Sequence, residues 1–155
     1  KQTVDPSALA RAVVDSLQFE LAGRQVEINI AELPTCQADP VLLRQVFANL
    51  LGNAFKYSRP RQTAQIEVGW QKQDGETVYF VRDNGVGFDS RYTDKLFGVF
   101  QRLHSAGEFE GTGIGLALCR KIAERHGGSI TAHSAPNQGS TFEVLLPVFH
   151  PKTER

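Results

Sequence analysis

The spacing of apolar residues switches between a helical and a strand period along this chain. Three segments repeat apolar positions every three or four residues, as amphipathic helices do: from 6 to about 23, 40–57 and 113–125. Five segments alternate apolar and polar residues, as half-buried strands do: 26–30, 66–70, 77–82, 129–134 and 141–146. The first two helices each open on an Asp-Pro pair, at Asp5 and Asp39, in which aspartate caps the helix and proline fits its first position. A short extension is expected at 35–38, and a weaker helical pattern covers 89–100.

Tight turns join most of these strands into hairpins. Asp74-Gly75 is a hairpin turn, and the segment 136–139 separates the last two strands. A doubly wound nucleotide-binding fold would instead alternate single strands with helices. The pattern predicts an α/β two-layer sandwich, in which helices cover one face of a mixed, mostly antiparallel sheet. We expect one domain over residues 1–150, with 1–22 as its linker or first helix, and a loose tail at 151–155.

The charge balance argues against partners that bind through bulk electrostatics. Lysine and arginine total 17, as do aspartate and glutamate, so the formal net charge is zero. We therefore expect no nucleic acid partner and no direct membrane contact, and a bound anion must be held by local geometry. No apolar run reaches membrane-spanning length, and the first residues lack the charged start and apolar block of a signal peptide.

The cysteines and histidines form no metal or redox motif. Cys36 and Cys119 match no zinc or redox spacing, which favours buried free thiols in a reducing compartment. The four histidines also lack a metal-ligand pattern; they are His104, His126, His133 and His150. Because the chain begins at Lys1 and contains no methionine, we expect it to be a segment of a longer protein.

Two glycine clusters bracket the segment 88–110. They read Asp83-Asn84-Gly85-Val86-Gly87 and Gly111-Thr112-Gly113-Ile114-Gly115. Glycine has no Cβ, so backbone amides can approach a ligand closely, and the second cluster runs directly into a helix, where phosphate can bind the first amide groups. The alternative is that the glycines only form tight turns.

A polar edge follows the apolar face of the helix at 40–57. Asn49, Asn53 and Lys56 recur there at intervals of four and three residues. An asparagine oxygen is a hard neutral ligand that suits Mg²⁺, and lysine can neutralise phosphate charge. Asn53 is the candidate metal ligand, with Asn49 assisting directly or through water. The alternative is a solvated helix edge, although asparagine is mildly unfavourable inside a helix.

Asp83 lies where a strand meets the first glycine cluster. A carboxylate there can accept a hydrogen bond from the exocyclic amine of a purine, which favours adenine over guanine. The alternative is an Asx-turn that ends the strand. The segment 88–110 carries Phe97, Phe100 and Phe109 among polar residues, so it suits either a lid that closes over a ligand or a long loop with core anchors.

At these positions the sequence resembles the catalytic, ATP-binding domain of sensor histidine kinases, in the wider group shared with gyrase B subunits, heat-shock chaperones and mismatch-repair ATPases. The matching segments are the N box at 43–57, the first glycine box at 83–87, the F box at 96–102, the second glycine box at 111–116 and a glycine-threonine element at 139–142. The residues at 97–104 and 108–113 are most similar to kinases of the phytochrome type. The resemblance implies a Bergerat-type ATP-binding fold.

The resemblance also implies a role for each matching residue. Asn53 would ligate Mg²⁺ with the support of Asn49, and Asp83 would bind the adenine amino group. Asn49, Lys56 and Arg102 would be the catalytic residues, the last two by offsetting charge on the transferring group. The other implied nucleotide contacts are Lys56, Tyr57, Gly85, Gly87, Gly111, Thr112, Gly113, Ile114, Gly115, Leu116 and Thr141.

The implied activity is transfer of the γ-phosphate of Mg-ATP to a histidine, as the catalytic half of a two-component sensor histidine kinase. The chaperone and gyrase branches have a glutamate in place of Asn49 to activate water, so asparagine favours transfer over hydrolysis. The family's phosphoacceptor histidine lies upstream, before an acidic residue and a proline, and no histidine here has that context.

We therefore expect an acceptor on a separate dimerisation and phosphotransfer domain of the same parent protein, and a response regulator downstream. The parent would be a homodimer, the isolated domain a monomer, and the location cytoplasmic. Two alternatives remain open: a nucleotide-binding regulatory module without transferase activity, and a stand-alone ATPase of the chaperone-like branch.

Overall fold

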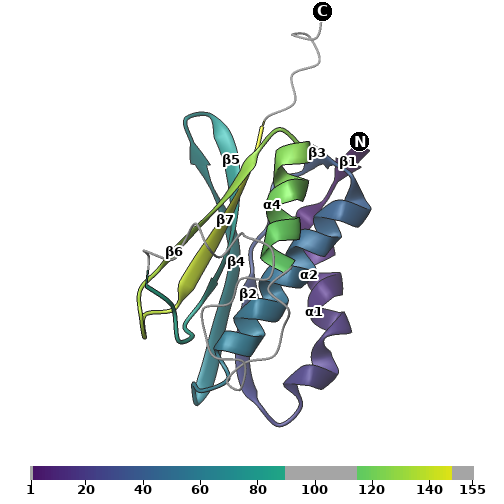
Figure 1. Ribbon diagram of the computed structural model, residues 1–155. Helices are drawn as coiled ribbons and strands as arrows, with labels where there is room; N and C mark the ends of the chain where they lie inside the picture. The colour runs from purple at the N-terminus through teal and green to yellow at the C-terminus, as the bar shows by residue number, and fades with distance from the viewer. Residues whose placement is uncertain (1, 90–114, 148–155) are drawn as a thin grey trace, which may run out of the picture.

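The computed structural model describes residues 2–89 and 115–147, which form a five-stranded sheet with helices on one face and a small two-stranded sheet beside it (Figure 1). The elements, labelled as in Figure 1, are β1 (Gln2–Val4), α1 (Pro6–Ser16), the 3₁₀ turn η1 (Gln18–Leu21), β2 (Gln25–Ile30), β3 (Cys36–Ala38), α2 (Pro40–Tyr57), β4 (Thr63–Gln73), β5 (Glu76–Asp83), α4 (Gly115–Arg125), β6 (Ser129–Ser134) and β7 (Ser140–Leu146).

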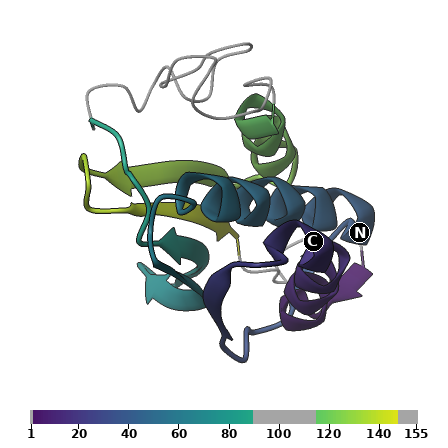
Figure 2. The ribbon, with the colours of Figure 1, turned by 90° about the horizontal axis from the view of Figure 1, so that it is seen from below.

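The sheet has the mixed pairing that the sequence predicted. Its strands lie in the order β2-β4-β5-β7-β6. β2 pairs with β4 in parallel, and the other neighbours pair antiparallel. The three described α-helices lie on one face of the sheet, as the view from below in Figure 2 shows. The predicted α/β two-layer sandwich is therefore confirmed.

Both predicted Asp-Pro helix starts are present. The Asp5 carboxylate accepts a hydrogen bond from the amide of Ser7 at 3.0 Å, at the start of α1. Asp39 accepts from the amides of Val41 and Leu42 at 2.9 and 3.2 Å, at the start of α2. Each carboxylate thereby satisfies amide groups that the first helical turn leaves without a partner.

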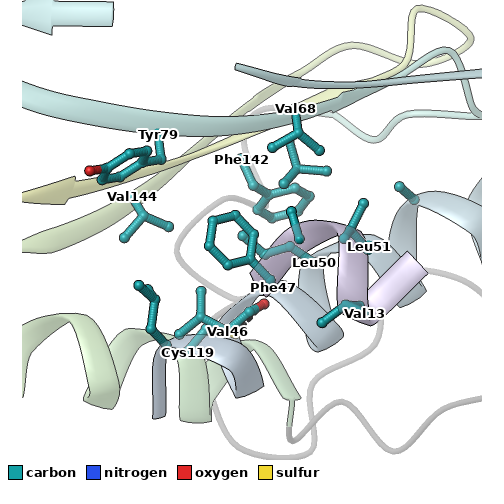
Figure 3. Close-up of a cluster of buried hydrophobic side chains, with 14 of the residues drawn as sticks. Val13, Val46, Phe47, Leu50, Leu51, Val68, Tyr79, Cys119, Phe142 and Val144 are labelled. Atoms are coloured by element: carbon teal, nitrogen blue, oxygen red, sulfur yellow. Dashed lines mark hydrogen bonds between the residues drawn. The ribbon is translucent and has the colours of Figure 1, made fainter. Parts of the chain in front are cut away.

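Helix α2 is the centre of the core. Its buried side chains face the sheet on one side and the flanking helices on the other, as Figure 3 shows. The labelled contacts are Val46, Phe47, Leu50 and Leu51 of α2, Val13 of α1, Cys119 of α4, and Val68, Tyr79, Phe142 and Val144 of the sheet. Close packing on both sides fixes the rotation of α2 about its own axis, and so fixes the direction of its polar edge.

Some element boundaries differ from the prediction. Helix α1 ends at Ser16 rather than near residue 23, and η1 continues the segment as a 3₁₀ turn. The Ser16 hydroxyl donates to the carbonyl of Val13 at 2.7 Å, a local bond that competes with helix continuation. Apolar spacing persists through the turn, so periodicity alone could not locate this end. Strand β1 was not predicted, and β4 is longer than the predicted 66–70.

Other predictions fall on residues that the structure does not describe. The helical pattern at 89–100, the proposed lid at 88–110 and the loose tail lie almost wholly in 90–114 and 148–155. Both cysteines are free thiols, as predicted; Cys119 is buried, whereas Cys36 is only half-buried. Within 2–89 and 115–147, the helices are too short or too polar to cross a membrane.

Candidate functional site

The polar edge of α2 lies open beside its buried face. Asn49, Asn53, Lys56 and Tyr57 are all half-buried, next to neighbours whose side chains are fully enclosed. Three of them follow the helical repeat, so they point in nearly the same direction. The predicted alignment of these groups along one edge is therefore present.

Asn49 meets the start of α4. Its amide nitrogen donates to the carbonyl of Gln45 at 3.0 Å, which turns its oxygen towards Gly115. A Cβ placed on Gly115 would lie 2.5 Å from that oxygen, so a larger residue at this position would displace the Asn49 side chain. The amides of Gly115 and Leu116 belong to the first turn of α4, where helical N–H groups have no intrahelical partner. The structure thus places the edge of α2 beside a helix N-terminus.

The other end of the α2 edge meets the first glycine cluster. The amide of Val86 donates to the carbonyl of Tyr57 at 3.1 Å. A Cβ on Gly85 would lie 2.5 Å from the same carbonyl oxygen. The last turn of α2 and the turn after β5 are therefore in direct backbone contact, and Gly85 is required for that contact.

Asp83 is enclosed at this junction. Only 6% of its surface is exposed, and its carboxylate accepts a hydrogen bond from the Gly85 amide at 2.7 Å. Burial raises the pKa of Asp83 to about 6, against the opposing effects of the Gly85 and Ser140 amides and of the Arg61 charge. The carboxyl group is thus close to its titration point near neutral pH.

The hairpin between β6 and β7 closes the far side of the first glycine cluster. Gly87 has φ of 66°, and a Cβ there would collide with the carbonyl of Ala135. Gly139 has φ of 81°, and a Cβ there would collide with the carbonyl of Asp83. The amide of Asn137 donates to the carbonyl of Val86 at 2.6 Å. Both glycines are therefore demanded by the chain's own packing.

The structure separates Thr141 from this group of residues. Strand β7 pairs Ser140 with Asp83 and Thr141 with Arg82. The Thr141 hydroxyl accepts a hydrogen bond from Arg82 on the exposed face of the sheet, at 3.3 Å. Ser140 is buried, and its amide bonds to the Asp83 carboxylate. The alternation of side chains along a strand predicts this arrangement. Phe142 faces the core, so Ser140 faces the core as well, and Thr141 faces the opposite side of the sheet.

Sequence reasoning also missed Arg61. Its guanidinium donates to the carbonyls of Asn84 and Gly85 at 2.6 and 2.9 Å, next to the candidate carboxylate. An arginine in the turn after a helix has no distinctive spacing, so its role depends on contacts that only the folded chain forms. The remaining predicted residues, Arg102 and Gly111 to Ile114, lie outside the described part of the chain.

The polar groups on the α2 edge suit a cation that takes few protein ligands. In the described residues no three His, Cys, Asp or Glu side chains gather to form a metal site. Among those same residues, no group hydrogen-bonds to the Asn53 side chain, so its amide oxygen is available to an outside ligand. Mg²⁺ commonly keeps several waters and binds phosphate oxygens with one or two protein ligands. Asn53 fits that requirement.

The chain matches known proteins over most of its length. Residues 38–150 match the family model described as "Histidine kinase-, DNA gyrase B-, and HSP90-like ATPase". Cyanobacterial phytochrome A of Nostoc sp. is 40% identical over 140 residues, which cover 90% of this chain and 18% of the relative. The chain thus spans less than a fifth of the length of that relative.

Solved structures show the same architecture. The mycobacterial sensor histidine kinase MprB superposes with a TM-score of 0.76 at 21% identity, covering 94% of this chain and 96% of that structure. Full-length ShkA in complex with AMPPNP superposes with a TM-score of 0.73 at 25% identity, covering 96% of this chain and 32% of that structure. The chain belongs to the family of histidine kinase-, DNA gyrase B- and HSP90-like ATPases, as a catalytic ATP-binding domain of the histidine kinase type.

Proposed function

We propose that this chain binds ATP with Mg²⁺ and delivers the γ-phosphate to a histidine on a separate domain of its parent protein. The observation that carries the proposal is the arrangement at the two ends of the α2 edge. The buried carboxylate of Asp83 lies by Tyr57, and the start of α4 lies by Asn49. The two α2 residues are eight positions apart, or about 12 Å along the helix axis.

A nucleotide along this edge would have its base at one end and its phosphates at the other. Asp83 would accept the hydrogen bond of an adenine amine, and the first amides of α4 would face the phosphates. Asn53, between the two ends, would hold Mg²⁺, which would offset the negative charge of the phosphates. Lys56 adds a positive charge on the same edge, and Arg102 is proposed to add another.

Asn49 supports transfer in preference to hydrolysis. Its side-chain amide has no basic group with which to take a proton from water, and its orientation is set by the carbonyl of Gln45. Catalysis would rest on positioning and on charge compensation, as in other phosphoryl transfers. The acceptor would then decide the reaction, and we propose a histidine of the parent's dimerisation domain.

The names and lengths of the relatives support a proposal about the parent protein. The relatives include proteins named as a phytochrome and as a histidine kinase, and both are far longer than this chain. We infer a parent protein with further domains, phytochrome-like in its kinase half, that dimerises and passes phosphate to a response regulator. A cytoplasmic site of action follows from the proposed use of ATP.

The test mixes the purified chain with a separately purified dimerisation and phosphoacceptor domain and ATP labelled at the γ-phosphate. Label should appear on the acceptor and should depend on Mg²⁺. Asn53→Ala should reduce both Mg-ATP affinity and transfer more than tenfold, from loss of a metal ligand. Asn29→Ala, an exposed asparagine on β2, is the matched control and should behave as wild type.

Three other outcomes of this experiment would lead to different conclusions. Binding of Mg-ATP without transfer to any acceptor would support the regulatory module instead. Unchanged affinity in Asn53→Ala would reject the metal assignment. Steady release of free phosphate by the isolated chain, abolished by Asn49→Ala, would support the stand-alone ATPase.

A further inference from the structure

Arg61 joins three segments that are distant in the sequence. It lies in the turn after α2, where its Nε donates to the carbonyl of Asn84 at 2.6 Å. One terminal nitrogen donates to the carbonyl of Gly85 at 2.9 Å, and also reaches the carbonyl and side-chain oxygen of Asn137 at 3.2 and 3.3 Å. The planar guanidinium thus ties the first glycine cluster to the β6–β7 hairpin.

Two of the carbonyls that Arg61 binds, those of Asn84 and Gly85, follow Asp83 directly in the chain. Gly85 is bonded through both of its backbone groups: Arg61 binds its carbonyl, and its amide donates to the Asp83 carboxylate at 2.7 Å. A shift of Gly85 would therefore move the donor that orients this carboxylate. Because glycine restrains the backbone least of all residues, an external clamp is needed to hold such a turn in one conformation.

Arg61 also carries the charge that acts on Asp83. In the described part of the chain it has no carboxylate partner within ion-pair distance, so its bonds are to neutral carbonyl and amide oxygens. Around the Asp83 carboxyl, β7 supplies the polar Ser140, β4 the apolar Ile66, and α2 the backbone carbonyl of Tyr57. The positive charge of Arg61 lowers the pKa of Asp83 against the larger effect of burial.

We propose that Arg61 is a positioning residue for base recognition, which holds the 84–85 carbonyls so that the Asp83 carboxylate is aimed at the exocyclic amine of adenine. The inference rests on the proposed function, because it assigns the base-reading half of that site. It makes Arg61 a determinant of base selectivity without contact to the nucleotide.

The test measures the affinity of the purified chain for ATP and for ITP by calorimetry, between pH 5 and pH 8.5. ITP has a carbonyl oxygen in place of the adenine amine, so it cannot donate to Asp83. Arg61→Gln should weaken ATP binding about tenfold at pH 7 and ITP binding far less, because the lost bond is to the amine. The pH midpoint of ATP binding should rise, because Asp83 would protonate at higher pH without the neighbouring charge.

Two variants complete the design. Arg61→Lys keeps the charge but cannot reproduce the forked contacts, so the ATP to ITP preference should fall about threefold with an unchanged pH midpoint. Arg11→Gln removes an equal charge from an exposed pair with Glu32 and should match wild type. If Arg61→Gln fails to fold, as judged by circular dichroism, the ratio of ATP to ITP affinity in Arg61→Lys tests the inference instead.

Equal loss of ATP and ITP affinity would show that Arg61 only supports the fold, and would overturn the inference. So would an unchanged ATP to ITP ratio in a folded variant. Failure of the wild-type chain to bind ATP would instead reject the proposed function, so the two failures are distinguishable.

Discussion

Gly85 shows how one residue serves the fold and the site together. From the sequence, its lack of a side chain was attributed to the close approach of a ligand, with a tight turn as the alternative. In the structure, a Cβ would lie 2.5 Å from the Tyr57 carbonyl oxygen and 2.8 Å from the Asp83 carboxylate. The contact between α2 and the first glycine cluster thus requires glycine before any ligand is considered.

We predict that Gly85→Ala destabilises the domain by roughly 2–4 kcal/mol, because the backbone carbonyl it meets cannot move without disturbing the end of α2. Gly52→Ala is the matched control. Gly52 lies within α2, and its Cβ would meet no atom within 4 Å, so this change should stabilise by about 0.5–1 kcal/mol through helix propensity. Urea unfolding of both variants checks the pair. Equal effects of the two changes would contradict the packing argument.

The buried carboxyl of Asp83 predicts a pH dependence of stability. Its pKa is raised from 3.8 to about 6 in the folded chain. An acid with a raised folded pKa contributes stability that is fully present below the unfolded pKa and is lost as pH rises through the folded pKa. The window for Asp83 therefore runs from about pH 4 to about pH 6.

Asp83→Asn removes that ionisation, so its stability relative to wild type should rise across this window, by at most about 3 kcal/mol for roughly two pKa units. Any constant cost of the amide group cancels, because only the change with pH is compared. Urea unfolding at pH 4, 5, 6 and 7 provides the measurement. A difference that stays flat with pH would show that Asp83 does not titrate there.

At the scale of elements, α2 has both ends fixed by side chains. Asp39 caps its start, and the Asp39 amide donates to Nε2 of His126 at 3.1 Å, which links α2 to the end of α4. At the other end Arg24 donates to the carbonyl of Phe55 at 2.7 Å and to the Ser58 hydroxyl at 3.2 Å. The helix that presents the polar edge is thus held lengthwise as well as by its core face.

We predict that Asp39→Ala lowers the free energy of unfolding by about 1 kcal/mol, because the first-turn amides of α2 lose their acceptor. Asp39→Asn should restore most of the loss, since an asparagine oxygen caps a helix nearly as well. Chemical denaturation of the three proteins tests this. A loss of equal size in the asparagine variant would point to charge rather than capping.

At the scale of the whole molecule, the site depends on segments that are far apart in the chain. It combines the α2 edge, the turn after β5, the start of α4 and the hairpin before β7, all on or beside the helix-covered face (Figure 2). Because these segments come together only in the folded chain, ligand binding should be coupled to global stability.

Mg-ATP at 100 times its dissociation constant should therefore stabilise the chain by about 2.7 kcal/mol, through mass action on the folded state. Thermal unfolding should shift upward by several degrees. In Asn53→Ala the same nucleotide concentration should give a much smaller shift, whereas Asp39→Ala should lose stability equally with and without nucleotide. A ligand-independent melting temperature in wild type would contradict the nucleotide assignment.

Local chemistry accounts for the parts of the fold that the sequence predicted well. The Asp-Pro caps, the strand alternation and the turn at Asp74-Gly75, where both residues have positive φ, depend on neighbours within a few positions. The alignment of Asn49, Asn53 and Lys56 follows from the helical repeat alone. The end of α1 was misplaced, because apolar spacing does not distinguish an α-helix from the 3₁₀ turn that follows it.

The sequence by itself determined the described α-helices, the five strands of the main sheet, the two-layer class and the polar edge of α2, because these are encoded by residues close together in the chain. Only the tertiary structure decided that Ser140 rather than Thr141 lies at Asp83, that Gly85, Gly87 and Gly139 are required by backbone contacts, and that Arg61 clamps the same turn. Those facts depend on register and on contacts between segments tens of residues apart, where the free energy of packing, and not local propensity, selects the arrangement.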